Sequence, residues 1–345
     1  MTLTIRRLAP RDIPVAGALV AEQIARWHAM DAAVAVPQPA QRAAELIVRF
    51  DAQAEQSISL VAEAGGVLAG YLAAQLQTLD PDSVERVWLP DRCVNCEVLL
   101  QMAVAAGQAW DDVFPPLWRA LEAALHLPPS FPVVLALVPA AAGLDALLER
   151  LGFRHTSTFA YLPLDGIPAR PEPGPGVRVR PAQAADRAAV LELFGELVAY
   201  HVANDPTADR DHPLVLHDFA RLITDLNPRR WQLLVAEEAA APGTLLGFAL
   251  GSVEVEESSP TYIPMLPTGP VGFVHEFAIT AGARRRGVGR ALHAALAGAL
   301  AARTPGPPLH GLWLIYRTSN PTSSRFWPAV GYRPLYQMWR RGGWA

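Results

Sequence analysis

Three consecutive arginines and two closely spaced glycines form the segment of this chain that is best suited to hold a charged group. The segment consists of Arg284, Arg285, Arg286, Gly287, Val288, Gly289 and Arg290. Glycine lets the backbone approach a ligand closely, and the unpaired N–H groups at a helix start bind phosphate. An apolar run, Val271–Ile279, precedes the segment, and an alanine-rich run, Ala291–Ala302, follows it. The order of strand, basic glycine turn and helix therefore predicts a diphosphate-binding site.

The spacing of the glycines distinguishes between classes of phosphate site. A dinucleotide-binding turn requires Gly-x-Gly-x-x-Gly and a P-loop requires Gly-x-x-x-x-Gly-Lys-Ser/Thr, and neither pattern fits this segment. The segment has the form Arg-x-x-Gly-x-Gly from Arg284 to Gly289. It resembles the pyrophosphate loop of the GNAT superfamily, the acyl-CoA-dependent N-acyltransferases. The alternative interpretation is a helix that merely starts after a glycine turn beside a solvated basic patch.

The residues after the loop resemble the same family in the same order. The apolar run 309–316 predicts a buried strand. GNAT proteins typically carry an Asn after this strand, a short helix with an aromatic residue and a closing Gly-aromatic pair. The chain has Asn320, Trp327 and Gly331 followed by Tyr332 at these places. The resemblance implies an N-acetyltransferase with acetyl-CoA as co-substrate, a small primary amine as acceptor, direct attack and no metal.

The resemblance also assigns the cofactor-binding residues. The strand before the loop splays from its neighbour in GNAT folds, so its main-chain groups hold the pantetheine arm and the acyl carbonyl. Here that strand end consists of Phe277, Ala278 and Ile279. The loop residues Arg284–Arg290 and Asn320 complete the expected cofactor-binding set.

Two residues of the same strand are candidates for the general base that removes a proton from the attacking amine. Glu276 is the first candidate, because acidic residues in this part of the strand often act in the family. His275 is the second, because an unperturbed imidazole titrates near neutral pH. Strand alternation predicts Glu276 and Ala278 on one face, with His275 and Phe277 on the other. A Glu that only pairs with an arginine or orients the substrate, and a packed histidine, are the alternatives.

The general acid is less evident, because Trp327 occupies the position where many GNAT enzymes carry a tyrosine. Tyr316 is a weak candidate for that role, with packing in the core as its alternative. Tyr200, His201 and Asp205 lie near the end of a predicted helix and are candidates for binding a cationic amine. Ordinary turn chemistry is the alternative for the acidic and polar residues of this region.

The two halves of the sequence repeat the same order of patterns. Each starts with a strand-like segment, Leu3–Arg7 or Val177–Pro181, that precedes an amphipathic helix. Each ends on a Gly-aromatic pair, at Gly152 and at Gly331. The chain therefore resembles a tandem GNAT protein.

The repeat predicts the domains and the fold class. Residues 165–176 are rich in proline and glycine and predict a linker. A degenerate GNAT-like domain is expected at 1–164 and a GNAT acetyltransferase domain at 177–345. The fold class is α+β (mixed α/β), and each domain is expected to contain a twisted, mixed, mostly antiparallel central sheet flanked by helices.

A comparison of the halves indicates which one binds the cofactor. Alignment of the segment 118–125 with 289–296 places Trp118 opposite Gly289 and Pro116 opposite Gly287. Proline lacks an N–H donor, tryptophan fills space, and the acidic residues 111–112 precede them. The first half is therefore expected to have lost the phosphate site.

Composition and charge exclude several other classes. The net charge is only −4, so no nucleic-acid or membrane-surface partner is expected. The N-terminus has no apolar signal-peptide core, and no apolar run is long enough to span a membrane, so a cytoplasmic location is expected. Cys93 and Cys96 lack further metal ligands nearby and are expected to be reduced thiols, with a redox pair or half a zinc site as alternatives. A monomer or homodimer is expected, and a non-catalytic acyl-CoA-binding or regulatory module is the alternative function.

Overall fold

The computed structural model describes residues 2–31, 39–51, 57–81, 83, 86, 89–96, 101–138, 143–163, 176–205, 213–227, 229–255, 269–302 and 308–343. These residues form two compact units. The first consists of Met1–Ser157 with Leu335–Ala345, and the second consists of Thr158–Ser258 with Pro267–Pro334. The linker predicted at 165–176 lies outside the described residues, except for its last glycine.

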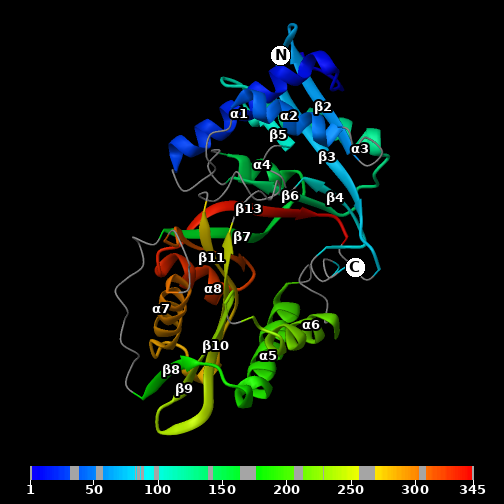
Figure 1. Ribbon diagram of the computed structural model, residues 1–345. Coiled ribbons are helices and arrows are strands. Elements are labelled where there is room, and N and C mark those ends of the chain that lie inside the picture. Colours follow the sequence, from blue (N-terminus) through cyan, green and yellow to red (C-terminus); the bar gives the residue numbers. More distant parts are fainter. Residues whose placement is uncertain are drawn as a thin grey trace. The chain divides into compact units, whose positions relative to one another are not determined.

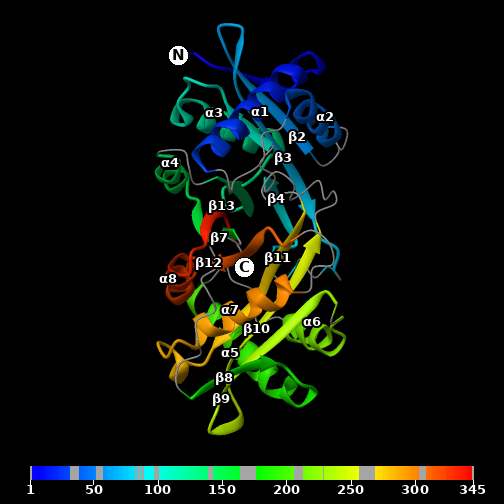
Figure 2. The same ribbon diagram turned by 60° about the vertical axis from the view of Figure 1, so that its left-hand side comes forward.

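The first half of the chain contains strands and helices in alternation. Its strands are β1 (Thr4–Arg7), β2 (Ser57–Ala64), β3 (Val67–Thr78), β4 (Arg92–Cys96), β5 (Met102–Val104), β6 (Val133–Leu137) and β7 (Arg154–Pro163). Its helices are α1 (Ile13–Met30), α2 (Ala40–Asp51), α3 (Trp110–Leu125) and α4 (Leu144–Arg150). Both ribbon views show α1 packed beside α2 (Figures 1 and 2).

The second half repeats this order. Its strands are β8 (Val177–Pro181), β9 (Trp231–Glu238), β10 (Ala241–Val255), β11 (Pro270–Ile279), β12 (Gly311–Arg317) and β13 (Arg333–Arg341). Its helices are α5 (Arg187–Asn204), α6 (Pro213–Thr224), α7 (Val288–Ala301) and α8 (Pro321–Ala329).

Each unit is built on a mixed, mostly antiparallel sheet. The strand order is β1-β2-β3-β4-β6-β13 in the first unit, with β5 beside β3, and β7-β12-β11-β10-β9-β8 in the second. The pairs β4–β6 and β11–β12 are parallel, whereas β1–β2, β2–β3, β8–β9 and β9–β10 are antiparallel. The predicted fold class is confirmed.

The last strand of each half packs mainly in the unit formed by the other half. The β7 residues Ala160 and Leu162 belong to a core cluster of the second unit, whereas Trp339 of β13 belongs to the core of the first. Strand β13 pairs with β6, with Gln337 opposite Leu137. The packing units therefore differ from the sequence repeat by these exchanged strands.

The sheet of the second unit separates two apolar cores. The α7-side core contains Val274, Leu292, Leu296 and Leu300, and the α5-side core contains Phe194, Val198, Phe248 and Leu250. Figure 1 shows α7 (orange) on one side of β10 and β11, with α5 and α6 (green) on the other. Seven consecutive residues of α7, Ala291–Ala297, are buried, so this helix is enclosed on most sides rather than along a single face. This burial fixes the helix and its N-terminus in the second unit.

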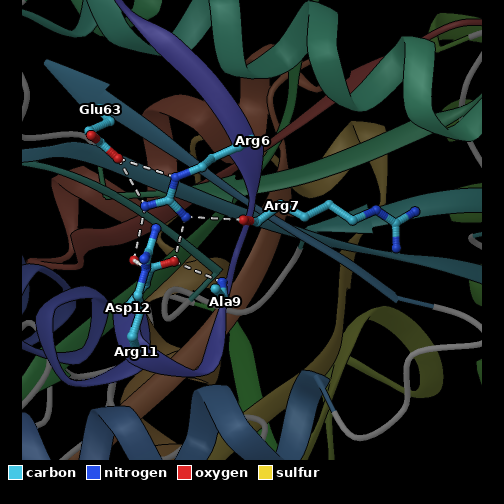
Figure 3. Close-up of polar contacts among 6 residues, drawn as sticks. All are labelled: Arg6, Arg7, Ala9, Arg11, Asp12 and Glu63. Atoms are coloured by element: carbon cyan, nitrogen blue, oxygen red, sulfur yellow. Dashed lines mark hydrogen bonds and ion pairs between the residues drawn. The ribbon is translucent and has the colours of Figure 1, made fainter. Parts of the chain in front are cut away.

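An arginine with two carboxylate partners occurs at the same place in both halves. Arg6 bonds Asp12 at 3.0 Å and Glu63 at 2.9 Å (Figure 3), and Arg180 bonds Asp186 at 2.7 Å and Glu237 at 2.7 Å. The acidic residues stand 6 and 57 residues after the arginine in each half. The matching spacing and geometry show that both units use the same device to join their first strand to the following helix and to the next strand.

Candidate active site

The basic glycine loop forms the start of α7. Gly287 is the N-cap of the helix and has φ +80°, and Arg285 also has a positive φ, of +64°. A side chain at Gly287 would have open space but a strained backbone, so conformation is the reason for glycine here. The first N–H groups of α7 lack helical acceptors and lie at the positive end of the helix dipole. The loop therefore has a geometry suited to an anion, and its binding of a diphosphate stays a prediction.

The arginines of the loop are exposed and differ in their partners. Arg286 forms a bidentate ion pair with Glu238 of β9, at 2.7 and 3.2 Å. This contact lowers the pKa of the Glu238 carboxyl. Arg284, Arg285 and Arg290 have no ion pair with any other described residue. Three cationic side chains beside the helix N-terminus are thus available to an anionic ligand.

Strand β11 opens away from β12 before it reaches the loop. The parallel register runs only from Gly272 opposite Leu312 to Val274 opposite Leu314, although β11 continues to Ile279 and β12 to Arg317. Ile315 is 41% exposed at this point although its strand lies between β7 and β11. The splay expected for this strand is therefore present within the described residues.

The main-chain groups of Phe277 and Ile279 point into this opening. Thr280 donates its N–H to the carbonyl of Leu246 on β10, at 2.9 Å. Hydrogen-bonding direction alternates along an antiparallel strand. The main-chain N–H and C=O of Ala278 therefore also face β10, whereas those of Phe277 and Ile279 face away from β10. Among the described residues, no side chain is hydrogen-bonded to the main chain of Phe277 or Ile279. Of the three residues expected to hold the acyl group, two are oriented for it.

A β-bulge lies at His275, next to the opening. Leu250 pairs with Glu276, but the next residue, Gly251, pairs with Val274, so His275 is an extra residue in β11. Its Nε2 is 2.8 Å from the hydroxyl of Ser252, and its ring packs on Trp231 beside the α5-side core. The alternation predicted for His275, on the face of Phe277, is wrong. A bulge shifts the side-chain period by one residue, and Phe277 packs with Val274 on the α7 side.

The environment of His275 makes it a poor base. Burial and the positive charge of Arg230 lower the pKa of His275 to about 3. An imidazole with this pKa is neutral at physiological pH and holds a proton weakly. Glu276, half-buried at the end of the bulge, stands at the mouth of the opening between β11 and β12.

These features agree with the comparison to known protein families. Residues 192–332 match the model of the Acetyltransferase (GNAT) family. This part of the chain belongs to the GNAT family. Its members are acyl-CoA-dependent N-acetyltransferases, so acyl-CoA and an acceptor are the substrates that the family implies.

Two solved structures are similar to this chain over nearly its full length. A GCN5-related N-acetyltransferase from Sphaerobacter thermophilus is 18% identical, with 99% of this chain and 96% of that chain covered and a TM-score of 0.50. A tandem GNAT protein from the clavulanic acid biosynthesis pathway is also 18% identical, covers 98% of both chains and has a TM-score of 0.43. The comparison with curated proteins gave no significant match.

The aromatic residues near the opening between β11 and β12 mostly have packing roles. Trp327 packs edge-on against Phe277 at 5.2 Å. Tyr332 is buried and its hydroxyl lies 3.1 Å from Nε2 of His293. Tyr316 is half-buried against the α7-side core. The described contacts of Tyr316 do not include a proton-transfer partner, and its role as the general acid stays a prediction.

Asn320 has a structural role that its sequence position did not reveal. Its side-chain oxygen accepts hydrogen bonds from the N–H groups of Thr322 and Ser323, so Asn320 is the N-cap of α8. A cap of this kind stabilises a helix by about 1 kcal/mol. The cofactor contact expected for Asn320 stays a prediction and would have to use its amide NH₂.

The candidates for substrate binding lie at the end of α5. The rings of Tyr200 and His201 are neighbours, with centroids 6.3 Å apart. Asp205 is buried, and its Oδ2 accepts a hydrogen bond from Ser319 and lies 3.8 Å from the guanidinium of Arg317. The charge of Asp205 is therefore partly neutralised. Sequence reasoning missed Arg317 and Ser319, because their contact joins segments 114 residues apart for the serine.

The corresponding turn in the first unit lacks the features of a phosphate site. Helix α3 starts at Trp110 with Ala109 as N-cap, so Asp111 occupies the position that Gly289 has in α7. The sequence alignment that placed Trp118 opposite Gly289 is wrong. Trp118 lies in the middle of α3, buried against Phe153, because the helix continues through its two prolines. An acidic first turn repels an anion, so the prediction that the first half lacks a phosphate site now rests on Asp111 instead of Trp118.

Other predicted features can be placed briefly. Cys93 and Cys96 are both buried free thiols in β4. Within the described ranges, no group of His, Cys, Asp and Glu could hold a metal ion. The helices described here are all too short or too polar to cross a membrane.

Proposed function

We propose that the second unit transfers an acetyl group from acetyl-CoA to a primary amine of a small molecule by direct attack. The observation that carries this proposal is the opening of β11 from β12 directly before the basic loop of α7. It places outward-facing main-chain groups next to an anion site on one continuous segment, Phe277–Arg290. A thioester attached to a diphosphate needs both features in this order.

In this proposal the loop binds the diphosphate and the strand holds the acyl arm. The N–H groups at the start of α7, with Arg284, Arg285 and Arg290, offset the phosphate charge. Main-chain groups of Phe277 and Ile279 bond the pantetheine and the acyl carbonyl. N–H groups directed at the carbonyl oxygen stabilise the negative charge that develops there during attack.

Glu276 is proposed as the general base. The amine nitrogen attacks the thioester carbon, a C–N bond forms, and the C–S bond breaks with the electron pair leaving on sulfur. Glu276 takes the proton that the amine loses, directly or through a water. The thiolate leaves as the CoA anion and takes its proton from solvent or from Tyr316. His275 is not assigned to this step, because its low pKa makes it a weak base.

Glu276→Gln tests the assignment, with His275→Gln as the control on the neighbouring residue. We expect Glu276→Gln to lower turnover by about 10²- to 10⁴-fold, the usual contribution of a general base. The affinity for acetyl-CoA, measured by calorimetry, should stay within about threefold of wild type. His275→Gln should lose much less turnover than Glu276→Gln. Full turnover in Glu276→Gln would contradict the role of this residue.

The acceptor is to be found by measuring CoA release with panels of small amines, amino acids and aminoglycosides. Release that depends on one amine supports an acetyltransferase. Tight binding of acetyl-CoA without turnover on any panel would favour the non-catalytic acyl-CoA-binding module. Failure of the wild-type chain to bind acetyl-CoA at all would refute the cofactor assignment.

A further inference from the structure

In the first unit, two side chains of α1 bond the main chain of β5. Gln23 is 2% exposed, and its amide donates to the carbonyl of Met102 at 3.1 Å and accepts from the N–H of Val104 at 2.9 Å. Arg26 donates to the carbonyl of Val104 at 2.8 Å. The other edge of β5 pairs with β3. The glutamine amide thus bonds β5 as the peptide group of a neighbouring strand would.

Strand β5 corresponds to the part of β11 that faces the opening. Ala105, directly after β5, donates its N–H to Ala69 of β3, and Thr280, directly after β11, donates to Leu246 of β10. Gly70 pairs with Val104, and Gly247 pairs with Ile279. These matching registers place Met102 opposite Phe277 and Val104 opposite Ile279 in a comparison of the two units.

Helix α1 corresponds in the same way to α5. Each helix starts directly after the aspartate of the arginine–carboxylate cluster, Asp12 or Asp186. Counted from these aspartates, Gln23 corresponds to Leu197 and Arg26 corresponds to Tyr200. Leu197 packs against the α5-side core, as does Ala278 of β11. The second unit therefore has a leucine where the first has its bonding amide.

We infer that Gln23 occupies the acyl-arm position of the first unit and that Leu197 keeps the same position open in the second. The inference rests on the proposed function for the location of the acyl arm. A glutamine amide offers one donor and one acceptor at the spacing of a peptide group. A pantetheine amide would use the same main-chain groups, so the two exclude each other. Leucine has no polar group with which to compete.

The test is Leu197→Gln in the full-length chain, with Leu197→Met as the control of similar length and no hydrogen-bonding amide. Two intramolecular hydrogen bonds of ordinary net strength should weaken acetyl-CoA binding by about tenfold or more. Leu197→Met should bind acetyl-CoA within about threefold of wild type. Adenosine 3′,5′-bisphosphate, which lacks the pantetheine arm, should bind all three proteins equally. Thermal unfolding checks that both variants are folded.

The outcomes separate the inference about Gln23 and Leu197 from the proposed function. Equal acetyl-CoA affinity in folded Leu197→Gln and Leu197→Met would overturn the inference while leaving the proposed function intact. Loss of adenosine 3′,5′-bisphosphate binding in Leu197→Gln would also overturn it, because the effect would not be confined to the acyl arm. A wild-type stoichiometry of two acetyl-CoA per chain would show that Gln23 does not close the first unit. Absence of wild-type binding would refute the proposed function itself.

Discussion

Gly289→Asp is expected to remove much of the acetyl-CoA affinity while the chain remains folded. Gly289 is the second residue of α7, and the first unit carries Asp111 at the same position of α3, where it pairs with Arg150. An aspartate is therefore compatible with the first turn of this helix. In α7 it would place a carboxylate where the diphosphate of the ligand is proposed to bind.

The magnitude follows from the charges. Two unit charges 4 Å apart interact by about 1 kcal/mol in water and about 4 kcal/mol at a protein surface with an effective dielectric constant of 20. Because the loop is largely exposed, we take about 2 kcal/mol, or roughly 30-fold weaker binding. The aspartate should itself stabilise the N-terminus of α7 by about 0.3–1 kcal/mol.

Gly289→Asn is the matched control, because asparagine has the shape of aspartate without its charge. A Cβ at this position would lie 3.2 Å from the ring of Phe326, and both variants share this tight contact. Calorimetry with acetyl-CoA should show the aspartate variant about 30-fold weaker than the asparagine variant at low salt. The difference should shrink in 1 M salt, where the Debye length falls to about 3 Å. Equal affinities of the two variants, or a difference that salt does not change, would refute the loop as the diphosphate site.

Three further predictions concern the fold that positions the site. Glu237→Gln should lower the free energy of unfolding by about 3 kcal/mol and Glu63→Gln by about 1 kcal/mol, in denaturant titrations, because Glu237 is 2% exposed and Glu63 is 28% exposed. Arg6 holds the pKa of Asp12 at about 2, and Arg180 lowers the pKa of Asp186 and Glu237. The free energy of unfolding should therefore be highest above about pH 5 and should fall as the pH drops towards 2. A free energy of unfolding that does not change over this range would contradict this. The fragment 158–334, which contains Ala160 and Leu162, should unfold more cooperatively by circular dichroism than the fragment 177–345, which lacks them; the reverse order would show that the exchanged strand is dispensable.

Local features of the site could be predicted from the sequence. The loop from Arg284 to Gly289 depends on the conformational freedom of glycine and on the free N–H groups of a helix start, and both are properties of a short segment. The order of strand, loop and helix was predicted for the same reason, and the structure has β11 and α7 at these places. The mostly antiparallel sheet followed from the family resemblance.

Predictions that required a count along the chain were less secure. The side-chain face predicted for His275 from strand alternation was wrong, because a bulge inserts one residue into β11 and no residue type in the strand predicts that bulge. The alignment of the two helices failed because similar alanine-rich segments lie at different distances from the first residue of α3 and of α7. Helix α3 begins at Trp110, eight residues before Trp118, whereas α7 begins at Val288, directly before Gly289.

The sequence by itself predicted which segment is suited to bind a diphosphate, since that property belongs to consecutive residues. Tertiary structure decided which polar groups remain available around it. Gln23 forms a hydrogen bond with Met102 of β5, which is 79 residues away in the sequence, and Glu238 forms an ion pair with Arg286, which is 48 residues away. Such contacts depend on how the helices and strands pack. In our inference, one residue type, glutamine or leucine, separates a closed unit from an open one. The basic loop predicts which half binds the cofactor, and the packing of α1 and α5 is the inferred reason for the difference between the halves.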